Sequence, residues 1–167
     1  MPHFDCSHAT IVGVHHYHRQ TKLTVPASEV FAYHERPDAF TKLTPPWVKM
    51  DVLSHGGITD GAIADLRIYA PPLGIPLRWT LRHEAYIPGE QFVDRQVSGP
   101  FRSWRHVHRF VDDGAGGCVI DDAIEFELPI PVPFAAQFVK AELDRLFDYR
   151  AELLGREFGA LHDENLG

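Results

Sequence analysis

Histidine and aspartate residues alternate with apolar residues in two segments that are typical of β-strands. In the segment 104–110, His106 and His108 share a face with aromatic residues, while the opposite face carries arginines. In the segment 120–128, Asp122 shares a face with isoleucine and phenylalanine residues. Successive side chains of a strand point to opposite faces and arginines favour water, so we expect both histidines and Asp122 to point inward. A histidine that touches an aspartate forms a general acid–base pair if a substrate reaches it.

The same alternation predicts further polar residues on this inward face. It places His83 inward in one neighbouring segment, and Asp94 and Gln96 inward in the next. The second assignment requires that the turn at 99–101 does not shift the strand register by one residue. Buried polar groups are costly unless each one is hydrogen-bonded. Two interpretations therefore stay open: a hydrogen-bonded network that fixes the sheet register, or a pocket whose few polar groups orient a mostly apolar ligand.

These inward residues define the predicted binding site. His106, His108 and Asp122 are the candidates for catalysis, with Asp94 as a second carboxylate. Aromatic walls and polar anchors together give the full set of predicted ligand-binding residues, which is Trp79, His83, Phe92, Asp94, Gln96, Trp104, His106, His108, Asp122, Phe126, Phe134 and Phe138.

Motifs for other kinds of chemistry are missing from the sequence. It contains no Gly-x-Ser-x-Gly, no Walker loop, no Gly-x-Gly-x-x-Gly after a strand and no HExxH, and we predict no cofactor. Cys6 and Cys118 lie far apart, so we expect two reduced thiols and neither a zinc site nor a disulfide. His15, His16 and His18 cluster, but His15 points to the other strand face and no nearby carboxylate or cysteine completes a ligand set. We predict no metal there.

Composition narrows the class of protein. The length of 167 residues suits a single domain. A net charge of -7 argues against nucleic-acid binding, so the three tryptophans and eleven phenylalanines are expected in the core or in cavity walls. No apolar run approaches the ~20 residues that span a bilayer. The N-terminal residues lack the basic and apolar regions of a signal peptide, and we expect a cytoplasmic protein.

The order of predicted elements indicates an α+β fold. A strand at 17–25 precedes two short helices, for which Ser28 is the expected N-cap of the first and Pro37 begins the second. Six strands joined by short turns without crossover helices then imply antiparallel hairpins. These strands are expected at 47–53, 62–70, 76–87, 92–98, 102–111 and 118–128.

A helical period replaces the alternation after residue 133. Apolar residues from Phe134 to Leu161 recur at helical spacing, and the opposite, polar face carries Arg150 among other charged residues. A helix of this kind must dock on the sheet. We therefore predict a curved antiparallel sheet wrapped around a long C-terminal helix, with residues 1–16 as an N-terminal arm, 17–162 as the domain and 163–167 as a tail.

Three stretches of sequence resemble a known group of proteins. They are Thr44-Pro45-Pro46-Trp47, the run from Phe92 to Phe110 that includes GPFRSWRHVHRF, and the run from Asp121 to Pro129. Over residues 17–158 the chain resembles the SRPBCC ligand-binding proteins of the START and polyketide cyclase/dehydrase-like helix-grip superfamily. In the branch that the GPFRSWRHVHRF stretch resembles, the same domain can be joined to an epimerase-like nucleotide-sugar domain.

The resemblance implies the helix-grip fold, with a seven-stranded sheet, two short helices after the first strand and a long terminal helix over a hydrophobic cavity. It implies no defined reaction, because the superfamily includes lipid carriers, hormone receptors, cyclases and hydroxylase-associated domains.

Three functions follow as hypotheses. The first is binding or carriage of a small hydrophobic or amphipathic ligand in a cavity between the sheet and the C-terminal helix. The second is a polyketide cyclase- or dehydratase-like acid–base enzyme that uses a His/Asp pair in that cavity. The third is a protein-interaction or regulatory module with a structural cavity. The sheet edge beside the N-terminal arm can pair with a second copy, so a homodimer is a further hypothesis.

Overall fold

A single antiparallel sheet and a long helix dominate the structure, which is a computed structural model that describes residues 13–70, 73–130 and 132–160. The sheet has the strand order β1-β7-β6-β5-β4-β3-β2. Its strands are β1 (His15–Leu23), β2 (Met50–His55), β3 (Ile63–Ala70), β4 (Ile75–Ile87), β5 (Gln91–Ser98), β6 (Ser103–Asp112) and β7 (Cys118–Glu127). The helices are α1 (Ala27–His34), α2 (Ala39–Lys42) and α3 (Ala135–Phe158). The predicted helix-grip fold is confirmed. Cys6, most of the predicted arm and the predicted tail lie outside the described residues.

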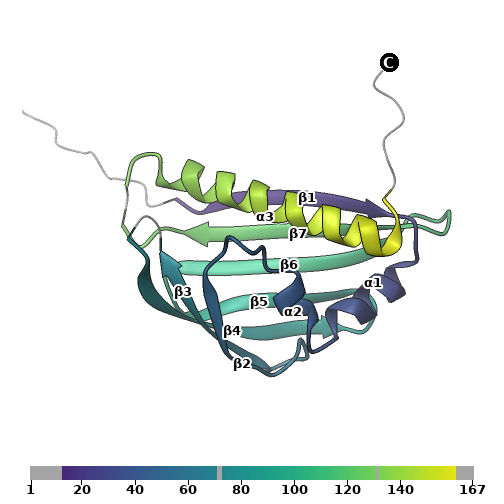
Figure 1. The fold of residues 1–167 in the computed structure, drawn as a ribbon, viewed down its shortest axis with the longest axis horizontal. Coiled ribbons are helices and arrows are strands. Elements are labelled where there is room, and N and C mark those ends of the chain that lie inside the picture. The colour runs from purple at the N-terminus through teal and green to yellow at the C-terminus, as the bar shows by residue number, and fades with distance from the viewer. Residues whose placement is uncertain (1–12, 71–72, 131, 161–167) are drawn as a thin grey trace, which may run out of the picture.

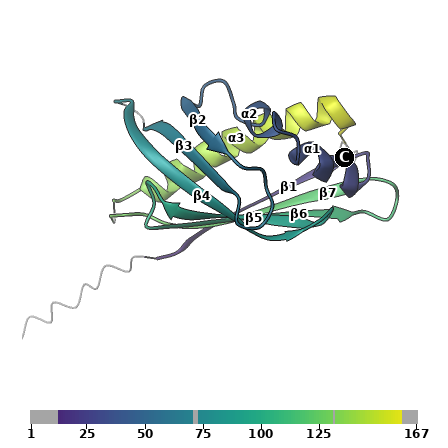
Figure 2. The same cartoon turned by 90° about the horizontal axis from the view of Figure 1, so that it is seen from below.

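The sheet curls around the helices. Figure 1 shows α3 running alongside β1 and β7, and Figure 2 shows β2, β3 and β4 rising toward the side of the sheet that carries the helices. β1 and β2 form the two edges of the sheet. The homodimer through the β1 edge stays a prediction. No helix among the described residues is long and apolar enough to cross a membrane.

Several element boundaries differ from the prediction for local reasons. β1 begins at His15 because β7 extends far enough to pair with it, and it ends at Leu23 because the Thr24 amide donates to the Gly159 carbonyl instead. β2 begins at Met50 rather than at residue 47, since the Val48 amide donates to the Pro45 carbonyl in a turn.

The start of α1 is a correction. Pro26, not Ser28, holds the N-cap position, and no side chain of the cap residue bonds the helix. The Ala27 amide instead donates to Asp112 Oδ1 at 2.7 Å, from the far end of β6. An acceptor that is distant in sequence thus satisfies one of the free amides at the helix start, and local sequence carries no sign of it.

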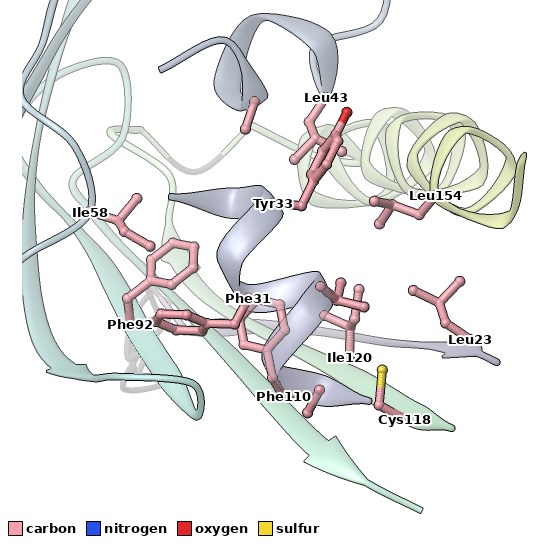
Figure 3. Packing of buried hydrophobic residues seen from close by; sticks show 13 residues of the cluster. Leu23, Phe31, Tyr33, Leu43, Ile58, Phe92, Phe110, Cys118, Ile120 and Leu154 are labelled. Atoms are coloured by element: carbon pink, nitrogen blue, oxygen red, sulfur yellow. The ribbon is translucent and has the colours of Figure 1, made fainter. Parts of the chain in front are cut away.

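The core has two apolar clusters on the concave face of the sheet. The first surrounds Phe31 of α1, whose ring packs against Phe92 and Phe110, with centroids 6.3 and 5.2 Å away (Figure 3). The second lies under α3 and includes Phe126 and Phe147, which are 0% and 1% exposed. Both clusters use the inward rows of the same strands, so the residues between the two clusters face the centre of the concave surface.

Candidate functional site

A row of five polar residues separates the two apolar clusters. On β6, His106 and His108 lie between an aromatic residue of each cluster, and on β7 Asp122 lies between Ile120 and Ile124. The strand register aligns these positions across the sheet. We call this set the polar row, and it consists of His83 on β4, Asp94 on β5, His106 and His108 on β6, and Asp122 on β7.

The members of the polar row contact one another directly. His83 Nε2 lies 3.0 Å from Asp94 Oδ1, and His108 Nε2 lies 3.2 Å from Asp94 Oδ2. On the other side, His106 Nε2 and His108 Nδ1 lie 2.9 and 2.8 Å from the same oxygen, Asp122 Oδ1. His106 Nδ1 faces Asp94 Oδ2 at 4.0 Å. The prediction that these residues share one inward face is confirmed, and β5 and β6 pair across that turn without a register shift.

Burial and charge act in opposite directions on these groups. Burial alone lowers the pKa of His108, but hydrogen bonds to Asp122 and Asp94 and their negative charges outweigh it and raise that pKa to about 9. Burial and the adjacent positive charge of His108 lower the pKa of His106 to about 4. Burial alone raises the pKa of both carboxyl groups, yet hydrogen bonds from the histidines hold both pKa values below the ordinary range. The row therefore contains one imidazolium between two carboxylates at neutral pH.

Two further histidines border the polar row, and the strand pattern did not predict them there. His34 of α1 is half-buried against Phe92 and Phe110, and its Nδ1 lies 2.8 Å from the Val30 carbonyl oxygen. His55 of β2 packs edge-on against His83, with ring centroids 5.8 Å apart. The alternating pattern could not include His55, because a bulge between Val52 and Ser54 shifts the register of β2.

Arg150 is a correction to the predicted polar face of α3. Its Nε donates to the Leu43 carbonyl at 3.0 Å, and its guanidinium lies 5.3 Å from the centre of the Phe147 ring. Burial lowers the pKa of Arg150, while the negative charges of Asp122 and Asp94 act in the opposite direction. The signal for its position was its spacing of three residues from Phe147, which places both side chains on neighbouring parts of the helix surface.

The aromatic residues of the predicted site fall into three groups. Trp79 and Trp104 meet edge to face, with centroids 5.3 Å apart, and Phe126 packs 6.1 Å from Trp104. Phe92 stacks on His108 with a centroid distance of 4.2 Å.

Gln96 does not reach the polar row, because its side chain donates to the Phe101 carbonyl at 2.7 Å and closes the turn between β5 and β6.

Phe134 and Phe138 are the third group. They were predicted to form cavity walls, but in the structure both side chains are exposed. Phe134 is 80% exposed and precedes α3 with a φ of 63°, while Phe138 is 56% exposed. The buried residues of α3 are Leu143, Phe147 and Leu154. In the first two turns of the helix, Ala136 and Val139 contact the core and are only partly buried, and full burial of the stripe begins at Leu143.

An apolar surface beside the polar row remains partly open. Val52 of β2 pairs with Leu66 of β3 and faces the same concave side, yet Val52 is 40% exposed while Leu66 is 1% exposed. Met50 and Trp79 are also only partly buried and pack against the cluster under α3. Val139 of α3 does the same from the helix side. We call Met50, Val52, Trp79 and Val139 the apolar mouth.

A hollow of about 500 Å³ lies at the rim of the sheet, at the ends of β2 and β3. Its lining includes Met50 of the apolar mouth together with Lys49, Asp51 and Tyr69, and no member of the polar row. This hollow is open and is not the predicted internal cavity, which stays a prediction.

The histidines of β1 form separate surface pairs. His18 Nε2 lies 2.6 Å from Asp121 Oδ1, and His16 Nδ1 lies 3.8 Å from Glu125 Oε1. These carboxylates are far from the histidines in the sequence, and only the antiparallel pairing of β7 with β1 brings them alongside. Within the described part of the chain, the group with spacing suited to a metal ion is instead Asp94, His106 and His108, whose donor atoms all lie within 4.8 Å of one another.

Cys118 is not a candidate nucleophile. Its side chain is buried at the start of β7. Burial and the nearby charges of Asp112 and Asp113 raise the pKa of its thiol to about 11, so the thiolate is scarce at neutral pH.

The fold and the concave site define a helix-grip protein, and comparison with known proteins gives the family. Residues 23–148 match the model of the family described as polyketide cyclase/dehydrase and lipid transport. The chain belongs to this family, as its sequence motifs predicted. The search of curated proteins found no match.

Solved structures share the fold. An aromatase/cyclase from a Streptomyces species, Zhui, is 16% identical, with a TM-score of 0.65 over 87% of this chain and 93% of that chain. A START superfamily protein from Mycobacterium smegmatis is 16% identical, with a TM-score of 0.62 over 86% of this chain and 97% of that chain. A nucleoside-diphosphate sugar epimerase from Corynebacterium glutamicum is 26% identical, with a TM-score of 0.61 over 83% of this chain but only 28% of its own chain.

Proposed function

We propose that this protein binds or carries a small amphipathic molecule between the concave face of β2–β4 and the first half of α3. The observation that carries the proposal is the apolar mouth. Val52 is 40% exposed directly opposite a fully buried Leu66, so the concave face is apolar but incompletely covered there. A ligand that covers such a surface gains free energy in proportion to the apolar area it removes from water. The family described as lipid transport supports a hydrophobic ligand.

Unpartnered polar atoms beside the mouth indicate that the ligand also has a polar part. His55 Nε2 and Trp79 Nε1 are buried and have no hydrogen-bond partner in the protein. His55 stacks on Phe40, with ring centroids 5.0 Å apart, so its ring is held in place without that bond. Buried nitrogens of this kind are rarely left unsatisfied. A hydroxyl or carbonyl oxygen of the ligand, or a water beside it, would complete them.

The same geometry favours binding over acid–base catalysis. Both ring nitrogens of His108 contact carboxylate oxygens of the protein, and His106 Nε2 contacts Asp122. A general acid or base must come within hydrogen-bond reach of the substrate. Both nitrogens of His108 pair with carboxylates, and no member of the polar row lines the open hollow, so the cyclase or dehydratase hypothesis has less support than binding.

Two matched valine variants test the proposal. Val52 and Val97 are both strand valines with exposed side chains, 40% and 55%, but Val97 lies on the opposite face of the sheet from Asp94 and Gln96. We expect Val52→Asp to weaken binding of the amphipathic fluorophore 8-anilinonaphthalene-1-sulfonate at least about tenfold, because a ligand would have to desolvate the new carboxylate. Val97→Asp should leave the affinity within about twofold, as expected for a surface change away from the site.

The fluorescence titration is run on both variants and on the wild type, with thermal unfolding to show that all three are folded. Equal affinities of the two variants, or no saturable binding to the wild type, would overturn the proposal. Mass spectrometry of organic extracts of the purified protein then identifies a natural ligand that co-purifies.

A further inference from the structure

Three donor atoms of the polar row converge in a way that suits a metal ion. Asp94, His106 and His108 each offer one donor atom, and these atoms lie within 4.8 Å of one another. The Asp94 Oδ2 atom is 3.2 Å from His108 Nε2 and 4.0 Å from His106 Nδ1. Ligands bound to one ion at about 2.0–2.1 Å lie about 3.0–3.4 Å apart. The first separation fits as it stands, and the second requires a contraction of about 0.6–1 Å.

Asp122 fixes the other side of both imidazole rings. His106 Nε2 and His108 Nδ1 approach the same oxygen of this carboxylate at 2.9 and 2.8 Å. An ionised carboxylate only accepts hydrogen bonds, so each of these nitrogens carries its proton on the Asp122 side. A metal ion binds the neutral form of an imidazole, and the nitrogens left for it, His106 Nδ1 and His108 Nε2, both face Asp94.

In the metal-free protein His108 Nε2 lies 3.2 Å from Asp94 Oδ2, at hydrogen-bond distance. A cation bound between these donors would take the place of that hydrogen bond. A metal-bound histidine in proteins commonly donates its other N–H to a carboxylate, which sets the tautomer and the ring orientation. Asp122 holds that position for both histidines. His83 Nε2 lies 3.0 Å from the second Asp94 oxygen, on the far side of the third ligand.

We propose that Asp94, His106 and His108 form a binding site for one divalent transition-metal ion of the Zn²⁺ or Fe²⁺ type, with Asp122 as the outer partner of both histidines. Two imidazoles and one carboxylate are donors that suit both ions. The Asp94 side chain keeps 15% exposure, compared with 6% and 8% for the two histidines, so the ion would enter from the Asp94 side. This site is independent of the proposed binding at the apolar mouth.

Cobalt(II) serves as the test ion because its visible absorption reports the ligands and the geometry. EDTA-treated wild-type protein is titrated with Co²⁺, and the absorbance is followed to saturation, with Zn²⁺ added afterwards as a competitor. We expect one equivalent to bind and Zn²⁺ to displace it. His106→Gln and Asp94→Asn should abolish the absorption, whereas Asp122→Asn should weaken binding by about 10–100-fold, as is usual for an outer partner.

His18→Gln is the matched control, because His18 is an exposed histidine that already pairs with an aspartate. It should bind Co²⁺ like the wild type. Loss of binding in this variant, or retention in His106→Gln, would assign the ion to the surface histidines and overturn the proposal. So would the lack of any saturable Co²⁺ absorption in the wild type.

A measurement on the wild type covers the case in which a variant of the polar row fails to fold. Long-range ¹H–¹⁵N spectra of the histidine rings are recorded while Co²⁺ is added. Selective broadening of the His106 and His108 signals supports the site. Broadening of the β1 histidine signals alone contradicts it.

Discussion

Removal of the Asp122 carboxylate is the most direct test of the polar row as a structural unit. Asp122 is 5% exposed, and its Oδ1 atom receives His106 Nε2 at 2.9 Å and His108 Nδ1 at 2.8 Å. Asp122→Ala leaves both nitrogens facing an apolar gap that is too buried to admit bulk water. The variant therefore loses the acceptor of two buried donors at once.

The expected cost follows from these two contacts. A buried donor that loses its acceptor costs about 1–3 kcal/mol, so two of them bracket a loss of about 2–6 kcal/mol. Removal of one partner from a buried ion pair usually costs about 3–5 kcal/mol, which lies within this range. We expect the free energy of unfolding to fall by about 3–5 kcal/mol. For a chain of this size that loss corresponds to a decrease in Tm of roughly 6–20 °C. Asp122→Asn keeps one acceptor and should lose less.

Urea unfolding in the presence of EDTA measures this loss without any contribution from bound metal. Asp121→Ala is the matched control, since Asp121 is the adjacent residue on the opposite face and pairs with His18 and Arg109 at the surface. Surface ion pairs contribute about 0–1 kcal/mol, so this variant should unfold close to the wild type. If Asp122→Ala costs less than about 1 kcal/mol, or no more than Asp121→Ala, the polar row is not the buried network described above.

Two further predictions concern the core and α1. Phe147→Ala should lower the free energy of unfolding in urea by about 3–5 kcal/mol, because Phe147 is 1% exposed. Phe138 is 56% exposed, so Phe138→Ala should change this free energy by less than about 0.5 kcal/mol. Similar losses in the two variants would refute the assignment of the buried helix face. Burial lowers the pKa of His34 to about 4, and the positive charges of His108 and Arg150 act in the same direction, while the hydrogen bond to the Val30 carbonyl and the charge of Asp122 oppose it. The folded protein therefore keeps His34 neutral, while the unfolded chain takes up a proton near pH 6.5. The stability that neutral His34 confers is therefore present above pH 6.5 and lost as the pH falls toward 4. Between pH 7 and 4.5, the free energy of unfolding of His34→Phe should fall less steeply than that of the wild type. Equal pH dependence of the two free energies would contradict this prediction.

Strand alternation in the sequence was sufficient to predict the inward rows of the sheet. Trp104, His106 and His108 face inward as predicted, because a period of two and outward arginines leave only one way to place the strand. The same reasoning placed Asp94 correctly. The order of the elements and the long C-terminal helix also followed from local patterns, and with them the fold.

Helix periodicity predicted less, because a helix surface changes its environment along its length. Phe134 and Phe138 belong to the apolar stripe by spacing, but at this end of α3 Ala136 and Val139 make the contacts with the core, and both phenylalanines are exposed. Arg150 belongs to the polar face by residue type, but α2 lies beside it and the Leu43 carbonyl accepts its hydrogen bond.

The partners within the polar row were decided only by the tertiary structure. The sequence determined that His106, His108, Asp94 and Asp122 share one face, since parity depends on neighbouring residues alone. It could not determine that one oxygen of Asp122 meets a nitrogen of each histidine, because that contact depends on the register between β6 and β7 and on side-chain rotamers. The positions of His34 and His55 beside the row likewise depend on how α1 and β2 fold over the sheet, which brings together residues that are far apart in the chain.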